Sequence, residues 1–316
     1  MKMKKTWILL LGLVLSAALH GQQRPLTATY MYNGLLLNPA YAGSLNLLSV
    51  TAVHRKQWIN VPGAPQYTSL SANNSFMGNR IGLGFYAQND QIGIHSDNSL
   101  YLSYAYKIST AFGILSMGLS GGFNDRISDP SKLNLLDKND PYLSLLAGQT
   151  YIKYFAPNFG TGVYFANPKF YAGFSIPYIV ENTTLEVSET IAINSEASRE
   201  SRYYYFTSGI IFPIGHSTKL SPSILLRAQE EARPTYDIST TVIFDNIAYV
   251  GVSVRNSGEL TFMGQIILNE NMRVGYAYDA ITNAQKSGSA GSHEILLNYR
   301  IKLKNYKHNP QCPSYF

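Results

Sequence analysis

The chain has 316 residues, of which 13% are aromatic and 14% charged, and it contains 24 tyrosines, 25 glycines and one cysteine. Soluble proteins are typically about 25% charged, so this composition argues against a cytosolic enzyme and favours a transmembrane β-barrel, whose two membrane interfaces carry girdles of aromatic residues. The formal net charge of +6 includes three lysines of a predicted N-terminal signal. It therefore does not indicate nucleic acid binding.

Residues 1–21 are predicted to be a secretory signal peptide. Three lysines precede an apolar run over residues 7–19, and the small residue Gly21 stands before Gln22, where cleavage is expected. The alternative, a membrane anchor, would need a longer apolar run. Removal of the signal leaves 22 basic against 19 acidic residues, and the one cysteine, Cys312, cannot form an internal disulfide.

Residues 22–45 show no clean alternation of polar and apolar residues. Asn38-Pro39 and Ala42-Gly43 both read as turns. We interpret this stretch as a folded N-terminal segment that precedes the barrel, either in the periplasm or as a plug of its periplasmic mouth.

Residues 46–304 are predicted to form an up-and-down antiparallel outer-membrane β-barrel. Apolar and polar residues alternate with a period of two, which places one set on each face of a sheet. Fifteen candidate strands become fourteen because Pro157 removes a ladder donor inside what we take as one kinked strand. The predicted strands cover 46–57, 66–76, 80–89, 98–109, 112–123, 148–156 joined to 159–166, 169–177, 202–213, 218–228, 235–244, 247–255, 259–268, 272–279 and 293–303.

The predicted connections alternate between short and long, which is typical of a barrel with short periplasmic turns and long outer loops. The longest are 124–147 and 178–201, and 90–97 is also expected to be a longer loop. An even number of strands places both termini in the periplasm, with residues 305–316 as a C-terminal periplasmic tail.

Motifs of catalysis are absent from the sequence. There is no nucleophile elbow, P-loop or zinc signature, and the histidines do not have metal-ligand spacing. We therefore predict no catalytic residue, no cofactor and no metal site. A catalytic pair of His293 and Glu294 is much less favoured than a polar strand start at the barrel rim, and an outer-membrane lipid hydrolase lacks a matching nucleophile and base.

Two groups of charged residues leave alternatives open. The 178–201 loop carries five glutamates against Arg199, so calcium or a basic partner is a candidate ligand, and a solvated loop near lipopolysaccharide is the favoured alternative. Arg273, Arg300, Lys302 and Asp279 are predicted to face the lumen. There they could line a selective pore, pair with one another or hold the N-terminal segment.

Eight sequence blocks together resemble the PorP/SprF outer-membrane proteins of the type IX secretion system of Bacteroidetes. They are 38–43 (NPAYAG), 55–58 (RKQW), 89–93 (NDQIG), 104–106 (YAY), 170–177 (FYAGFSIP), 222–227 (PSILLR), 275–279 (GYAYD) and 291–294 (GSHE). The motif residues singled out, without an assigned role, are Asn38, Pro39, Tyr41, Gly43, Arg55, Trp58, Asp279, His293 and Glu294.

The resemblance implies a non-enzymatic outer-membrane protein that supports secretion, or surface attachment, of proteins with a C-terminal sorting domain, such as the adhesins of gliding motility. Its implied partners are outer-membrane lipid, periplasmic components of the secretion system and the C-terminal domain of a secreted surface protein. The alternative function is an outer-membrane porin or ligand transporter, which requires an open lumen.

Overall fold

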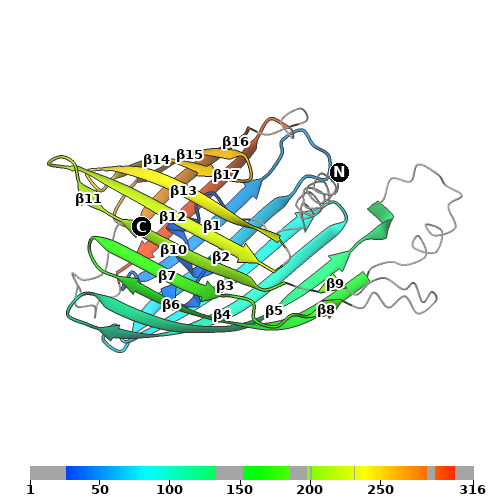
Figure 1. The fold of residues 1–316 in the computed structure, drawn as a ribbon, viewed down its shortest axis with the longest axis horizontal. Coiled ribbons are helices and arrows are strands. Elements are labelled where there is room, and N and C mark those ends of the chain that lie inside the picture. The colour runs from blue at the N-terminus through cyan, green and yellow to red at the C-terminus, as the bar shows by residue number, and fades with distance from the viewer. Residues whose placement is uncertain are drawn as a thin grey trace, which may run out of the picture.

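The computed structural model describes residues 26–132, 152–184, 198–199, 201–230, 232–282 and 289–302. Within these residues one antiparallel sheet closes on itself as a barrel (Figure 1). Closure comes from the pairing of the first strand with the last, which runs from Leu48 opposite Ile301 to Lys56 opposite His293. A closed sheet has no free edge, so every strand finds its backbone partners within the wall.

The barrel wall contains fourteen strands, as predicted, because β11 continues β10 beyond Ile211 in a sheet of 15 assigned strands. Strand β6 pairs with β5 without interruption across Pro157. This confirms that the two candidate strands on either side of Pro157 are one strand. The strands of the wall are β1 (Leu48–Lys56), β2 (Gln66–Phe76), β3 (Ile81–Ile92), β4 (His95–Ser109), β5 (Ile114–Ser128), β6 (Ile152–Ala166), β7 (Phe170–Ile176), β10 (Tyr203–Ile210), β11 (Phe212–Pro213), β12 (Thr218–Gln229), β13 (Ala232–Phe244), β14 (Ala248–Arg255), β15 (Glu259–Ile267), β16 (Met272–Ile281) and β17 (Ser292–Ile301).

Short turns connect the strands at one end of the barrel, which we call the short-turn end. The β13–β14 turn is typical: Asp245 and Asn246 have φ of 49° and 56°, the left-handed pair that suits a two-residue hairpin. The opposite, long-loop end includes the connections after β5 and β7, and the small β8 (Thr183–Thr184) and β9 (Ser198–Arg199) pair there.

The loop predicted over residues 90–97 is wrong. β3 and β4 continue to pair up to Ile92 opposite His95, so only Gly93 and Ile94 connect them. The polar residues of this stretch suggested a loop, but they belong to strand ends that are paired on both sides, with β2 up to Gln91 and with β5 from His95. Gly93 allows this tight connection because its φ is +57°.

The two faces of the wall are inverted relative to a soluble protein. In β14, Val250, Val252 and Val254 point outward and are 56%, 41% and 56% exposed, whereas Ser253 and Arg255 point inward and are buried. The same alternation runs through β15, β16 and β17. An apolar exterior around a polar interior is stable when lipid surrounds the barrel. No helix in the described ranges is long and apolar enough to cross a membrane.

Candidate functional site

Residues 26–45, which we call the lumen segment, lie inside the barrel. Three short 3-10 turns organise them: η1 (Tyr30–Tyr32), η2 (Gly34–Leu36) and η3 (Pro39–Tyr41). Ala40 and Ala42 are 0% exposed. The segment contains no charged residue, so its burial requires hydrogen-bond partners for backbone and hydroxyl groups but not the desolvation of a charge.

Glu294 of β17 holds the first turn of the lumen segment. Its carboxylate accepts hydrogen bonds from the backbone N–H of Ala28 at 2.8 Å and of Thr29 at 2.9 Å, and from the Thr29 hydroxyl. Glu294 is 1% exposed. A buried carboxylate is stable only when its lone pairs are satisfied, and here the segment itself supplies three of the donors.

Arg55 of β1 balances the charge of Glu294. Its Nη1 lies 3.1 Å from Glu294 Oε2 and 2.5 Å from Asp279 Oδ2, and Arg55 is fully buried. Asp279 of β16 in turn accepts a hydrogen bond from the Thr261 hydroxyl at 2.5 Å. Strands β1 and β17 are at opposite ends of the sequence, so barrel closure is what brings this triad together.

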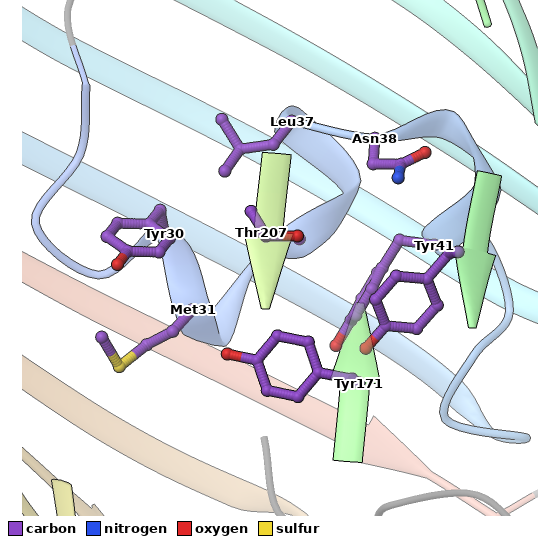
Figure 2. Close-up of a pocket in the computed structure, with 9 residues that line it drawn as sticks. Tyr30, Met31, Leu37, Asn38, Tyr41, Tyr171 and Thr207 are labelled. Atoms are coloured by element: carbon purple, nitrogen blue, oxygen red, sulfur yellow. The ribbon is translucent and has the colours of Figure 1, made fainter. Parts of the chain in front are cut away.

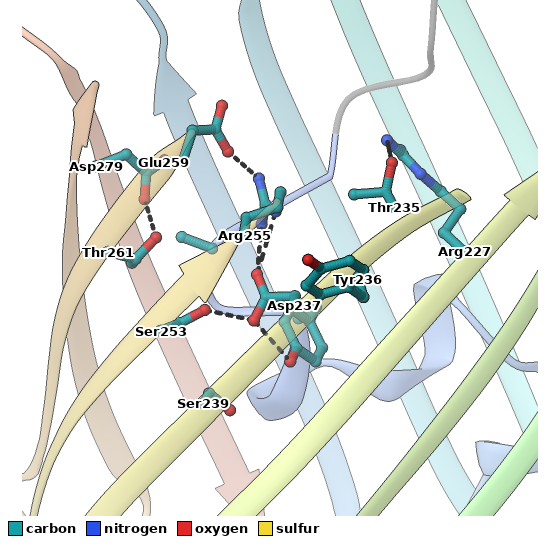
Figure 3. Close-up of polar contacts among 12 residues, drawn as sticks. Arg227, Thr235, Tyr236, Asp237, Ser239, Ser253, Arg255, Glu259, Thr261 and Asp279 are labelled. Atoms are coloured by element: carbon teal, nitrogen blue, oxygen red, sulfur yellow. Dashed lines mark hydrogen bonds and ion pairs between the residues drawn. The ribbon is translucent and has the colours of Figure 1, made fainter. Parts of the chain in front are cut away.

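A second charged cluster, on β13, β14 and β15, holds Tyr30 of the same turn. Asp237 accepts hydrogen bonds from the Tyr30 hydroxyl at 3.3 Å, from Arg255 Nε at 3.1 Å and from the Ser253 hydroxyl. Arg255 also pairs with Glu259. Figure 3 shows these side chains pointing into the lumen from neighbouring strands. Both clusters lie near the long-loop end.

Asn38 anchors the second half of the segment to the opposite wall. Its side chain accepts a hydrogen bond from Ala40 N at 2.9 Å and thereby caps η3, where Pro39 stands in the first turn. The same side chain donates to the carbonyl oxygen of Val163 in β6 at 2.9 Å. The amide thus fixes the turn and its position on the wall together.

Inward-facing glycines form a cradle beneath residues 38–43. A Cβ on Gly82 of β3 would lie 1.9 Å from Ala42 O, one on Gly118 of β5 would lie 2.2 Å from Ala40 N, and one on Gly162 of β6 would lie 2.2 Å from Asn38 Oδ1. No side chain fits at such distances. The wall therefore touches the backbone of the segment directly, which only glycine permits.

Gly43 and Lys107 close the segment at the short-turn end. Gly43 has φ of +66°, and its N–H donates to Asn73 Oδ1 at 3.2 Å. Lys107 of β4 donates from Nζ to the Gly43 carbonyl at 2.5 Å and also to Asn79. The chain turns here from the lumen into β1.

Two small cavities remain beside the segment. One, of about 40 Å³, lies between Tyr30, Asn38 and Tyr41 of the segment and Tyr171 and Thr207 of the wall (Figure 2). Another, of about 50 Å³, lies nearer the long-loop end. Its lining comprises Leu26, Thr27, Leu36, Leu37, Tyr67, Gln88, Asp90, Asp97, Ser99, Tyr178 and Tyr205.

The structure brings seven of the nine motif residues to the lumen, four on the segment (Asn38, Pro39, Tyr41, Gly43) and three on the wall (Arg55, Asp279, Glu294). Trp58 lies apart, in the β1–β2 loop, where its backbone N–H donates to the Ser292 hydroxyl oxygen at 3.4 Å. His293 bonds the Tyr276 hydroxyl at 2.6 Å on the outer face. Adjacent strand residues face opposite sides, so His293 and Glu294 are not a catalytic pair.

The sequence left open whether the lumen-facing charges line a pore, pair with one another or hold the N-terminal segment. Asp279 pairs with Arg55 and thereby supports the segment, whereas Arg273 and Arg300 form no ion pair with any described residue. Metal-binding groups of three or more acidic, histidine or cysteine side chains do not occur in the described ranges. Most of the acidic 178–201 loop lies outside those ranges, so the choice between a solvated loop and a site for calcium or a basic partner falls outside the described residues.

Several residues of the site escaped sequence reasoning. None of the sequence motifs contains Gly82, Gly118, Lys107 or Asp237. A usable signal was nevertheless present, because each occupies the lumen-facing parity of its strand. Parity alone, however, does not reveal which segment a glycine will face.

Similarity to a known protein family extends over most of the chain. A family model described as type IX secretion system membrane protein PorP/SprF matches residues 19–299. No curated protein matches.

Among solved structures, Omp33 of Acinetobacter baumannii is similar at 11% identity and a TM-score of 0.46, covering 81% of this chain and 98% of its own. The CymD monoaromatic hydrocarbon channel is similar at 10% identity and a TM-score of 0.45, covering 87% and 93%. The KdgM porin is similar at 9% identity and a TM-score of 0.39, covering 80% and 99%. At this level of similarity these structures carry no functional conclusion for the chain.

Proposed function

The chain belongs to the PorP/SprF family of type IX secretion system membrane proteins, and from this premise we propose that it holds or delivers secreted proteins at the outer membrane through their C-terminal sorting domains. The family is one of secretion-system barrels and not of enzymes. The proposal concerns the cargo and the way in which the barrel engages it.

The observation that carries the proposal is the filled lumen. A porin needs a continuous water path, but here residues 26–45 occupy the interior and are fixed at both halves, by Glu294 near the long-loop end and by Asn38 on the glycine cradle. A plugged barrel is suited to anchoring another protein, because a blocked lumen does not hinder binding at the loops.

We assign opposite partners to the two ends of the barrel. The long loops would face the cell exterior and contact the sorting domain, near the cavity that Tyr67 and Asp97 line. The short turns would face the periplasm and the rest of the secretion apparatus. In this arrangement residues 1–21 act as the signal peptide and residues 305–316 as a periplasmic tail.

Deleting the gene and measuring proteins on the intact cell tests the role in secretion. We expect at least one protein with a C-terminal sorting domain to leave the surface and accumulate in the periplasm or the medium, and the wild-type gene to restore it. Unchanged surface display of every such protein would count against the proposal.

The porin alternative is tested on the purified barrel. We expect planar bilayers containing the wild-type chain to show no steady conductance, because the lumen segment blocks the path. A stable open channel in the wild-type protein would favour the transporter instead.

Co-purification from detergent-solubilised membranes then identifies the bound partner.

A further inference from the structure

Three nitrogen-bearing side chains gather on the inner wall at the short-turn end, at a distance from the Glu294 and Asp237 clusters. Gln265 of β15, Arg273 of β16 and Arg300 of β17 all occupy lumen-facing positions. Arg273 lies opposite Asn298 in the β16–β17 ladder, two residues from Arg300, and opposite Ile267 in the β15–β16 ladder, two residues from Gln265. Diagonal neighbours of this kind are within reach of long side chains.

These side chains have donors left over. Gln265 is 5% exposed, yet its Nε2 has no hydrogen-bond partner in the described part of the chain, and neither does the buried Nη1 of Arg273. Arg300 is 4% exposed, and its Nε donates a hydrogen bond to Asn298 Oδ1 at 2.7 Å. Neither arginine pairs with a carboxylate of the described residues.

Two buried arginines near the long-loop end, by contrast, have carboxylate partners. Arg55 pairs with Asp279 and Glu294, and Arg255 pairs with Asp237 and Glu259. A guanidinium removed from water without a counter-ion is strongly destabilising, as is an amide N–H without an acceptor. The contrast indicates that the group at the short-turn end receives its acceptor from outside the described residues.

We propose that Gln265, Arg273 and Arg300 form a binding site for an oxyanion, a carboxylate or a phosphate, that enters the lumen from the short-turn end. The guanidinium fork is planar and matches two oxygens of such a group. The Gln265 amide adds a neutral donor from the neighbouring strand. In the cell the anion would come from the periplasmic side, as a free ion or as an acidic group of a protein.

Thermal unfolding of the purified full-length chain in detergent tests the site, with inorganic phosphate and acetate as probes against chloride at constant ionic strength. A ligand that binds only the folded barrel raises its unfolding midpoint by an amount that grows with the logarithm of its concentration above the dissociation constant. We expect phosphate, acetate or both to raise the midpoint by about 2–4 °C at a concentration roughly four times the dissociation constant. Whichever anion acts identifies the preferred group.

Two variants make the test specific. Arg273→Gln should lose the anion-dependent rise, whereas Arg126→Gln, which removes a guanidinium from the pair with Asp97 near the long-loop end, should keep it. Gln265→Glu places a carboxylate inside the site and should raise the midpoint in chloride while abolishing the response. If neither anion acts on the wild type, or if Arg273→Gln responds equally, the proposal is overturned.

Discussion

At the scale of single residues, the lumen is organised by groups that have one partner on the wall and one on the lumen segment. Glu294 accepts from Thr29 and pairs with Arg55, and Asn38 caps its own turn while donating to β6. Such shared groups couple the fold of the segment to the fold of the barrel, because removing one of them leaves buried partners on both sides unsatisfied.

Replacing Glu294 by alanine should destabilise the barrel markedly. The change removes the acceptor of two backbone N–H groups and leaves buried Arg55 with Asp279 alone. Loss of one member of a buried ion pair typically costs about 3–5 kcal/mol. Denaturant unfolding in lipid vesicles measures the loss; the neighbouring His293→Ala, on the outer face, is the matched control. Equal stability of the two variants would contradict the role given to Glu294.

Replacing Gly118 by alanine should displace the lumen segment. The new methyl group would lie 2.2 Å from Ala40 N, whereas a methyl on Gly121 of the same strand would meet Phe159 at an ordinary 3.5 Å. Overpacking of this kind costs about 1–3 kcal/mol. We expect lower stability and intermittent conductance in planar bilayers for Gly118→Ala, with Gly121→Ala resembling the wild type. Identical behaviour would argue against the cradle.

At the scale of elements, each strand has two separate tasks. Its outward residues meet lipid and its inward residues meet the lumen segment, so substitutions one position apart have unrelated consequences. In β17, Ile295 is 50% exposed on the outside while Leu296 is fully buried inside. The lumen segment contains only three short 3-10 turns in its described residues, and it owes its shape to a cap and to wall contacts.

Replacing Val252 in the middle of β14 by arginine should weaken the barrel through its lipid-facing side. An arginine near the bilayer midplane costs about 2–4 kcal/mol, and one near an interface costs about 0–1 kcal/mol. Gln91→Arg, at the exposed long-loop end of β3, is the control. Unfolding from lipid vesicles should separate the two, and a similar cost for both would place β14 outside the membrane.

Removing residues 27–43 should convert the plugged barrel into a channel. The wall hydrogen bonds that close the sheet do not involve the segment, so the barrel should still assemble, although with lower stability because Glu294 and Arg55 lose their packing. Heat-dependent migration on gels reports the fold, and planar bilayers report conductance. A folded variant that stays closed would show that something else blocks the lumen.

At the scale of the whole molecule, the barrel is polar and plugged inside, apolar outside and asymmetric from end to end. The long-loop end holds the carboxylate-rich clusters, and the short-turn end holds Arg273 and Arg300 without carboxylate partners among the described residues. The lumen segment connects these ends. This asymmetry fits a protein with one partner outside the cell and another in the periplasm.

Labelling of intact cells tests the orientation. With Cys312 replaced by serine, a cysteine at Val61, in the β1–β2 loop, should react with a membrane-impermeant maleimide, whereas one at His216, in the turn before β12, should react only after the outer membrane is opened. Both native side chains are exposed. Labelling of position 216 first would invert the proposed arrangement.

The sequence by itself determined the barrel, because a period-two pattern with lipid outside and polar groups inside is imprinted on every strand. The alternation of short and long connections indicated which strand ends lie together at the same end of the barrel. The motif blocks indicated the family. Only the tertiary structure decided what the lumen contains. Strand closure brings Arg55 to Glu294 and Asp279, and a folded segment meets Gly118 and Gly162, across sequence distances that no local pattern records.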